Sequence, residues 1–229
     1  MPLISVISIA KKEEDLIELK KSLSNQTFKD FEFVFSTKVM IPEAWNDAIN
    51  KAKGDYFVFT ESDAQPLNDH WLEEISKLLE KNIIMKGLEI RPSNLNMCNL
   101  VSDATIFKKM KFNEKFKICE DTEFFARLKK NGYSIKRMNN FPVIHTPSQT
   151  WKKTVSRSFL YGILMIKILI LHGIKNTENI NTQHPKPTKK VSINPISNHL
   201  RIIMVNFLYL LGLFVGMIIY IPFYFMGKK

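Results

Sequence analysis

The sequence has 229 residues, a formal net charge of +11 and two cysteines. This length suits one full-sized domain with extensions and is too short for two large domains. Cys98 and Cys119 form no CxxC pattern, so we expect reduced thiols in the cytosol and neither a disulfide framework nor a zinc site. A basic chain suits nucleic acid or anionic lipid. We expect lipid and no nucleic acid, because no nucleic-acid module is recognisable and basic residues gather before a long apolar segment.

The first eighty residues alternate strand and helix patterns. Short runs rich in Ile, Val and Phe predict buried strands, at residues 3–9, 31–36 and 56–60. Apolar residues three and four apart predict amphipathic helices, at 13–24, 43–53 and 69–81. We expect Gly54 with Asp55 to end the second helix, and Asn68 or Asp69 to cap the third. This alternation predicts a parallel, doubly wound sheet, which binds ligands beyond the carboxyl ends of its strands.

The pattern is weaker from residue 82 to residue 118, where we expect short strands near 83–90 and 100–107. A helix is predicted at 121–131, and Gly132 ends it. Two strands close the domain, YSIKRM and FPVIHT. The chain begins without a signal peptide pattern, so we expect this domain, residues 1–158, to be cytosolic.

The carboxyl-terminal part of the chain is apolar or basic. Residues 202–226 carry no charge and are flanked by Arg201 and Lys228, which predicts one transmembrane helix at 201–227. Residues 159–174 are shorter and are interrupted by Lys167. If both segments crossed the membrane, the Lys-rich linker at 175–200 would lie outside, against the positive-inside tendency. We therefore expect 159–174 to be an amphipathic helix in the membrane interface.

The stretch FTESDAQP places two carboxylates at the end of the third predicted strand. In an extended segment, Glu61 and Asp63 point the same way. Two carboxylates aimed at one point attract a hard divalent cation, which neutralises charge on a diphosphate leaving group. The alternative is a solvated loop whose acids cap the helix that follows.

Five segments in chain order resemble family 2 glycosyltransferases, which have the GT-A fold. They are SVISIA, SLSNQTFKDFEFVF, AWNDAINKAKGDYFVFTESDAQPLNDHWLEEI, FNEKFKICEDTEFFARLKKNGYSIK, and PVIHTPS with SRSFLYG. The resemblance covers residues 2 to about 162. It implies an α/β fold with a Rossmann-like mixed sheet and flanking helices, to which the membrane helix is added. The implied activity is metal-assisted sugar transfer with inversion, from a nucleotide-diphosphate sugar.

The resemblance also implies roles for individual residues. Asp63 is the principal ligand of Mg or Mn, and Glu61 stands where the family more often has Asp. Asp121 is the general base beside Glu120, although acids at a helix N-terminus are also favoured by the backbone alone. His145 completes the metal shell or contacts the diphosphate, or is a structural histidine. The nucleotide-binding residues that the resemblance implies are Ser8, Ala10, Trp45, Asn46 and Arg157. Trp45 is equally suited to be a core residue, and Arg157 is equally suited to be a surface residue or to contact a lipid head group.

One departure from the family concerns the loop after the second strand. The family usually has an acid there that contacts the nucleotide base, whereas FVFSTKVMIPEAW has none before Glu43. A catalytically silent glycan-binding or scaffold protein therefore stays an alternative. A nucleotidyltransferase is disfavoured, because AKKEEDL after the first strand is not a Gly-rich phosphate loop. The predicted anchor suggests a lipid-linked or cell-surface glycan acceptor, since tethering raises local concentration. The oligomeric state is left open.

Overall fold

The computed structural model describes residues 1–90, 96–145, 151–177 and 195–226. Its centre is a six-stranded sheet in the order β2-β1-β3-β7-β5-β8, and a small three-stranded sheet, β4-β9-β6, lies beside it. The strands of the large sheet are β1 Ile4–Ile9, β2 Phe31–Ser36, β3 Tyr56–Phe59, β5 Ile84–Lys86, β7 Leu100–Asp103 and β8 Ile135–Arg137. Those of the small sheet are β4 Ala64–Pro66, β6 Glu89–Ile90 and β9 Val143–His145.

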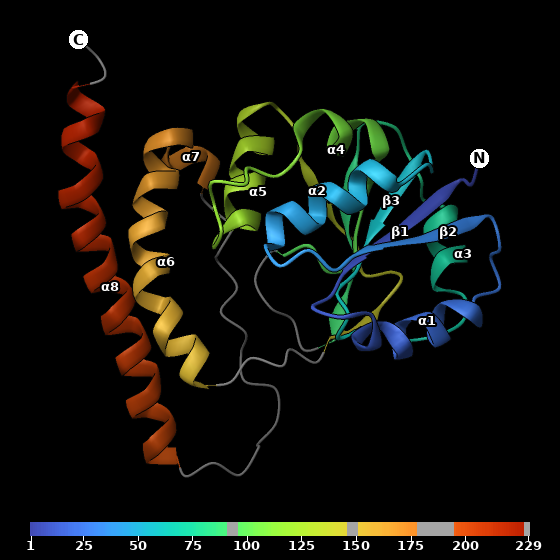
Figure 1. Ribbon diagram of the computed structural model, residues 1–229, viewed down its shortest axis with the longest axis horizontal. Helices are drawn as coiled ribbons and strands as arrows, with labels where there is room; N and C mark the ends of the chain where they lie inside the picture. The colour runs from blue at the N-terminus through green and yellow to red at the C-terminus, as the bar shows by residue number, and fades with distance from the viewer. Residues whose placement is uncertain (91–95, 146–150, 178–194, 227–229) are drawn as a thin grey trace.

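Helices cover both faces of the large sheet, as Figure 1 shows. On one face lie α2 Ile41–Lys51, α4 Ala104–Met110 and α5 Glu120–Lys130. On the other face lie α1 Ile17–Ser24, which follows a short 3-10 turn at Glu13–Leu16, and α3 Trp71–Ser76. Two long helices, α6 Trp151–His172 and α8 Pro195–Met226, stand to one side of this sheet domain, with the short α7 Ile174–Thr177 at the end of α6.

The first three strands pair as the sequence predicts. β1 lies between β2 and β3 and is parallel to both, with Ile4 opposite Phe31 and Tyr56. β7 then pairs antiparallel with β3 and β5, which makes the complete sheet mixed. The carboxyl ends of β1 and β3 therefore lie together at one edge, where a parallel sheet binds its ligands.

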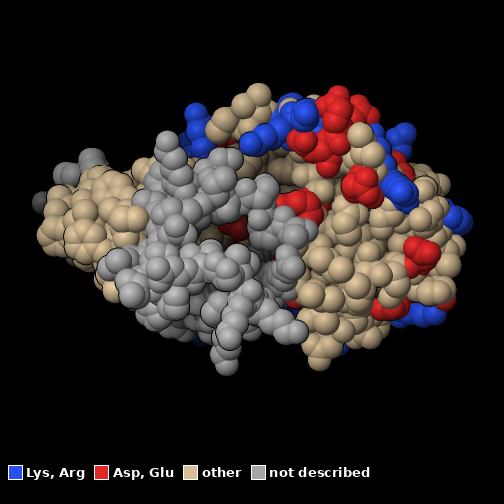
Figure 2. Space-filling view, turned by 90° about the horizontal axis from the view of Figure 1, so that it is seen from below, with Lys and Arg blue, Asp and Glu red and all other residues tan. Residues whose placement is uncertain are grey.

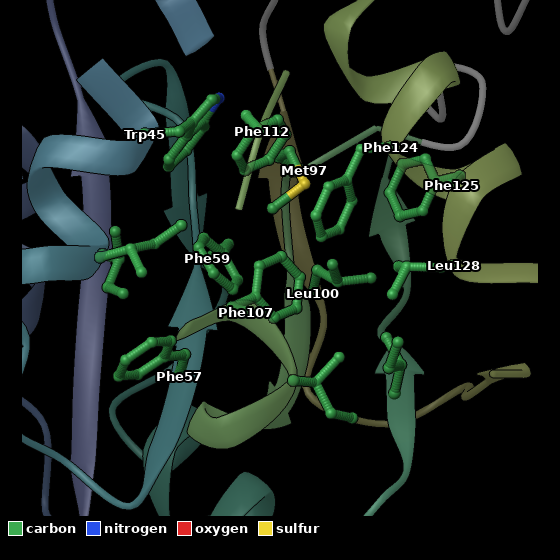
Figure 3. Close-up of a cluster of buried hydrophobic side chains, with 14 of the residues drawn as sticks. Trp45, Phe57, Phe59, Met97, Leu100, Phe107, Phe112, Phe124, Phe125 and Leu128 are labelled. Carbon is green, nitrogen blue, oxygen red and sulfur yellow. The ribbon is translucent and has the colours of Figure 1, made fainter. Parts of the chain in front are cut away.

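Side chains that alternate along each strand build a core on each face of the sheet. Ile4 and Val6 of β1 face α1 and α3, whereas Ile7 faces α2, α4 and α5. The second core is rich in aromatic rings (Figure 3): the ring centroids of Phe59 and Phe107 are 4.3 Å apart. This packing fixes α5, and therefore the acidic residues at its N-terminus, against the sheet.

Several predicted boundaries are wrong. Residues 104–107 begin α4 instead of continuing a strand, because the side chain of Asp103 accepts a hydrogen bond from the Thr105 N–H and caps a helix there. α3 is shorter than the predicted 69–81, and its N-cap is His70 without a side-chain cap. α2 ends at Lys51, before Gly54. Gly54 is instead a point of close approach, where a Cβ would lie 2.6 Å from the Ser5 backbone nitrogen.

The two long helices differ in their bounds from the predicted segments. α6 begins at Trp151, inside the predicted domain of residues 1–158, and continues past residue 159 without interruption. Much of the predicted linker, residues 178–194, lies outside the described residues. Among the described residues, Ile203–Pro222 of α8 is long and apolar enough to cross a membrane, with a mean hydropathy of 2.2. That finding rests on length and composition alone.

Candidate functional site

The small sheet brings the acidic pair to the predicted histidine. β4 follows Asp63 directly and pairs antiparallel with β9, so that Ala64 lies opposite His145. The sequence predicts an extended segment for the acidic pair, but Glu61–Ala64 is a turn closed by a hydrogen bond from the Ala64 N–H to the Glu61 carbonyl. The turn, and not the two-residue repeat of a strand, points both carboxylates at the histidine.

Three side chains converge at this point. The Nε2 atom of His145 lies 3.3 Å from Oε2 of Glu61 and 3.4 Å from Oδ1 of Asp63. Each of the three residues offers one ligand atom, and these three atoms all lie within 4.8 Å of one another. The histidine is buried, and the side chains of both acids are about one third exposed. The group thus has a closed side, formed by the protein, and an open side.

His145 is held from behind by a buried acid that the sequence analysis did not identify. Its Nδ1 lies 3.1 Å from Oε2 of Glu89, and both side chains are 3% exposed. The ammonium of Lys86, also buried, pairs with the other side of Glu89 and bonds to the Cys98 carbonyl oxygen. Burial alone raises the pKa of Glu89, but His145 and Lys86 outweigh it and lower the pKa, so the carboxylate is ionised.

The residues fit a divalent cation. The Nε2 atom of His145 is buried and makes no hydrogen bond to any residue that the structure describes. Burial alone lowers the pKa of His145, but the carboxylates of Asp63, Glu61 and Glu89 raise it to about 11. The negative charge facing Nε2 therefore binds a proton strongly, and a cation competes for the same place. The two carboxylates are ligands that suit Mg²⁺ and Mn²⁺, and the imidazole supplies a third donor beside them.

A second acidic pair begins α5. The Thr122 N–H donates a hydrogen bond of 2.6 Å to Oδ1 of Asp121. Glu120 directly precedes Asp121 at the start of the helix. The residue before them, Cys119, has a φ of 60°, a left-handed conformation that a residue with a side chain seldom adopts. The backbone thus turns sharply at Cys119, directly before the two acids that begin the helix.

Burial and nearby negative charge raise the pKa of both acids. Burial, and then the charge of Asp121, raise the pKa of Glu120 to about 8. Burial raises the pKa of Asp121 to about 6, and the negative charge of Glu61 also contributes. The charge of Glu61 acts on both groups, so the two acidic pairs lie near one another, and we call the region between them the common space. A carboxylate with a raised pKa suits a general base near neutral pH.

α6 borders the same space. The charge of Arg157 lowers the pKa of Glu120 and thus opposes its rise. Tyr161, one helical turn further, has its pKa raised by burial and then by the charge of Asp121. In the view of Figure 2, Asp and Glu side chains come into sight at the edge of the residues that are not described.

The predicted nucleotide residues occupy different environments. Ser8 is fully buried near the carboxyl end of β1, and its hydroxyl makes no hydrogen bond to any described residue. The Ala10 N–H bonds to Ser36 across the strand ends. Trp45 is a core residue, stacked on Phe112 with ring centroids 6.2 Å apart. Their contact with a nucleotide stays a prediction.

The Asn46 side chain joins α2 to the loop that precedes α5. Its amide donates to the Phe112 carbonyl at 3.0 Å and accepts from the Phe112 N–H at 2.7 Å. It also donates to Glu114 at 2.9 Å. These bonds give Asn46 a role in fixing this loop, and its predicted nucleotide contact also stays a prediction.

The loop after β2, which has no acid of its own, receives one from α2. The Ser36 hydroxyl donates to Oδ2 of Asp47 at 2.7 Å. Asp47 also pairs with Lys38 of this loop at 3.7 Å and with Lys51 at 2.6 Å. A carboxylate therefore lies beside the end of β2, although it comes from the helix and is already balanced by two cations.

Comparison with known proteins identifies the fold. No family model and no curated protein matches the sequence. Among solved structures, the Pyrobaculum calidifontis mannosyltransferase PcManGT, in complex with GDP-Man and Mn²⁺, aligns with a TM-score of 0.61 at 11% identity, covering 94% of this chain and 72% of that one. Residues 1–349 of S. aureus TarS align with a TM-score of 0.55 at 16% identity, covering 78% of this chain and 68% of that one.

TarS 1–349 also aligns in its complex with UDP-GlcNAc, with a TM-score of 0.54 at 12% identity. At these identities the likeness concerns the fold and not the activity. The chain has the GT-A fold, with a central mixed sheet, flanking helices and an added apolar helix near its carboxyl terminus.

Proposed function

We propose that this protein transfers a sugar from a nucleoside-diphosphate sugar to an acceptor hydroxyl, with inversion and with help from Mg²⁺ or Mn²⁺. The observation that carries the proposal is the convergence of Glu61, Asp63 and His145, near enough to Asp121 for the charge of Glu61 to raise its pKa. Two of the structural neighbours support it, since one is described with GDP-Man and Mn²⁺ and another with UDP-GlcNAc. The segments that resemble family 2 glycosyltransferases include all four residues.

In this proposal, Glu61, Asp63 and His145 hold the cation and Glu89 holds His145. A divalent cation held there would neutralise charge on the diphosphate leaving group. Asp121 takes the proton of the acceptor hydroxyl while that oxygen attacks the anomeric carbon from the opposite side. The bond from the anomeric carbon to the diphosphate oxygen breaks, and the nucleoside diphosphate leaves with the electron pair. Glu120, protonated near neutral pH, keeps a second negative charge away from Asp121.

We further propose that the acceptor is lipid-linked or lies at a membrane surface. α6 carries Arg157 and Tyr161 beside the acidic pair of α5 and also packs against the apolar α8. An acceptor carried by lipid could therefore reach Asp121 along α6. The cytosolic location of the sheet domain stays a prediction, and an in-plane position of α8 is proposed below in place of the single crossing by residues 201–227.

A second candidate is a catalytically silent GT-A protein that binds a glycan or a partner. The observation that favours it is the loop after β2, where Asp47 is already paired with Lys38 and Lys51. An acid that is balanced in this way is a weaker partner for a nucleotide base.

The test is release of nucleoside diphosphate by the full-length protein in detergent. UDP-, GDP- and dTDP-sugars are offered with Mn²⁺ or with a chelator, in the presence of a membrane lipid extract. We expect release from one donor, dependent on Mn²⁺ and reduced at least a hundredfold in Asp63→Asn and in Asp121→Asn. Glu13→Gln, at an exposed acid that pairs with Lys20, is the matched control and should match the wild type.

If no donor is turned over under any of these conditions, glycosyl transfer is contradicted and the silent binder is favoured. Release that persists in Asp63→Asn would contradict the assignment of the metal site while leaving the activity in place.

A further inference from the structure

α8 exposes one continuous apolar face. Five large apolar side chains are each between 57% and 62% exposed, namely Ile203, Phe207, Leu210, Phe214 and Ile218. Their spacing of three and four residues places them on one side of the helix. Single exposed apolar residues are ordinary, but a stripe of this length marks an interaction surface. We call these five residues the outer face of α8.

The opposite face of α8 is packed tightly against α6 through glycines. A Cβ on Gly212 would collide with the Phe159 carbonyl oxygen, and a Cβ on Gly162 would collide with that of Tyr209. Gly216 meets the α6 backbone in the same way. Small residues at such positions let two helix backbones approach closely. α8 is therefore seated along α6, and its outer face is turned away from the protein.

α6 in turn belongs to the sheet domain. Ile168 is fully buried in the core that includes α4 and α5. His172 lies 3.1 Å from the buried carboxylate of Glu123, and the Lys130 ammonium donates to the Leu171 carbonyl at 2.8 Å. These contacts fix the direction of α6, and through the glycines they also fix that of α8.

The two helices run parallel. Gly212 of α8 contacts Phe159 of α6. Further along both helices, the ammonium of Lys167 in α6 lies 5.9 Å from the ring centroid of Tyr220 in α8. Residue numbers thus rise together along the contact. Figure 1 shows the same arrangement: α6 ends at α7, and α8 begins again at the opposite end of the pair.

A parallel pair cannot cross a bilayer with this connection. Thr177 and Pro195 lie at opposite ends of the pair, so residues 178–194, whatever path they take, have to join those ends. Their sequence, ENINTQHPKPTKKVSIN, is polar and includes three lysines and two prolines. Such a segment would expose backbone groups and charges to hydrocarbon. A crossing by α8 alone would require it to leave α6, and the glycine contacts would be lost.

We propose that the outer face of α8 rests on an anionic lipid bilayer, with the helix axis in the plane of the membrane and the sheet domain in water above it. Charge supports lipid as the occupant. After Glu123 the sequence has one carboxylate side chain, Glu178, whereas basic residues flank the uncharged stretch 202–226 at Arg201, within α8, and at Lys228. A second copy of the chain would bring like charges together, but anionic head groups complement them. At the end of the molecule where α8 lies, Figure 2 shows uncharged side chains.

The first test measures the depth of α8 in vesicles. The full-length protein carries a spin label at one introduced cysteine, Ile203→Cys, Leu210→Cys or Ile218→Cys, while Cys98 and Cys119 are buried. Vesicles contain phosphatidylcholine with a minority of phosphatidylglycerol, and depth is read from the accessibility of each label to oxygen and to a nickel chelate. We expect equal, shallow depths at all three positions. A crossing helix would instead place Leu210 deepest, with the other two labels near opposite surfaces.

The second test measures vesicle binding by flotation. We expect Phe207→Glu with Phe214→Glu to lower the vesicle-bound fraction at least tenfold, with an unchanged circular dichroism spectrum. Val39→Glu, at a side chain 94% exposed in the sheet domain, is the matched control and should leave binding unchanged. Unchanged binding in the double variant, a crossing depth profile, or spin–spin broadening between labels of two copies would each overturn the proposal. None of these readouts depends on sugar transfer.

Discussion

At the scale of single residues, His145 depends on a partner that carries no local sequence signal. The orientation of its ring follows from the bond between Nδ1 and Glu89, which leaves Nε2 directed at Glu61 and Asp63. Lys86 keeps Glu89 ionised at a depth where an unpaired carboxylate would be costly. The chain Lys86, Glu89, His145 thus acts as a support for the metal site.

We expect Glu89→Gln to weaken the binding of Mn²⁺ by about tenfold to a hundredfold, because the ring loses the negatively charged acceptor that fixes its proton on Nδ1. Isothermal titration calorimetry measures the affinity. In the protein loaded with Mg²⁺, long-range ¹H–¹⁵N spectra should show the His145 proton on Nδ1 in the wild type and a mixture of states in the variant. Glu13→Gln is the control, and equal affinities for Glu89→Gln and the control would exclude this role.

At the scale of elements, the N-terminus of α5 concentrates charge where the helix backbone tolerates it. The first turn holds Glu120, Asp121 and Glu123, and the last turn holds basic residues. The carboxylate of Glu123 forms an ion pair with Arg127 at 2.9 Å and lies beside His172. Only the first two acids face the common space, and their raised pKa values are the result.

A raised pKa in an acid makes folding depend on pH with a definite sign. The folded state binds the Glu120 proton with a pKa of about 8, against 4.5 ordinarily, so stability is lost as the pH rises between these values. At pH values above 8, we expect Glu120→Gln to raise the midpoint temperature of thermal unfolding. The gain should be about 1 kcal/mol, because partial exposure screens the charge. Near pH 4.5 the variant should match the wild type, and a gain of the same size there would contradict this account.

The elements were predictable where a local pattern decides them. β1, β2 and β3 are short buried runs between helix signals, and each lies within one residue of its expected bounds. Residues 104–107 were assigned wrongly, because the apolar run ATIF suits either a strand or a buried helix. The SDAT sequence, with Asp103 as a cap, was the available signal for a helix.

The site was predictable only in part. The two acidic pairs and His145 belong to segments with a family resemblance, whereas Glu89 reaches the site through the pairing of β6 with β9, a contact between residues far apart in sequence. The turn at Glu61–Ala64 was likewise invisible, because the pattern before it is that of a strand. Residues positioned by long-range pairing carry no local signature.

At the scale of the whole molecule, α6 joins two surfaces. It borders the space of Asp121 through Tyr161 and carries α8 on its other side. An in-plane α8 and a catalytic space beside α6 would place the acceptor side of the protein close to lipid. This arrangement favours an acceptor that is itself held at the membrane.

The central claim is that Glu61, Asp63 and His145 bind a divalent cation for a nucleoside diphosphate. Its most direct test is the electron paramagnetic resonance signal of free Mn²⁺, titrated with the full-length protein in the presence of UDP or GDP. We expect the wild type and Glu13→Gln to remove the free-ion signal at equal protein concentration, and Asp63→Asn to leave most of it. A signal that Asp63→Asn removes as completely as the wild type would contradict the claim.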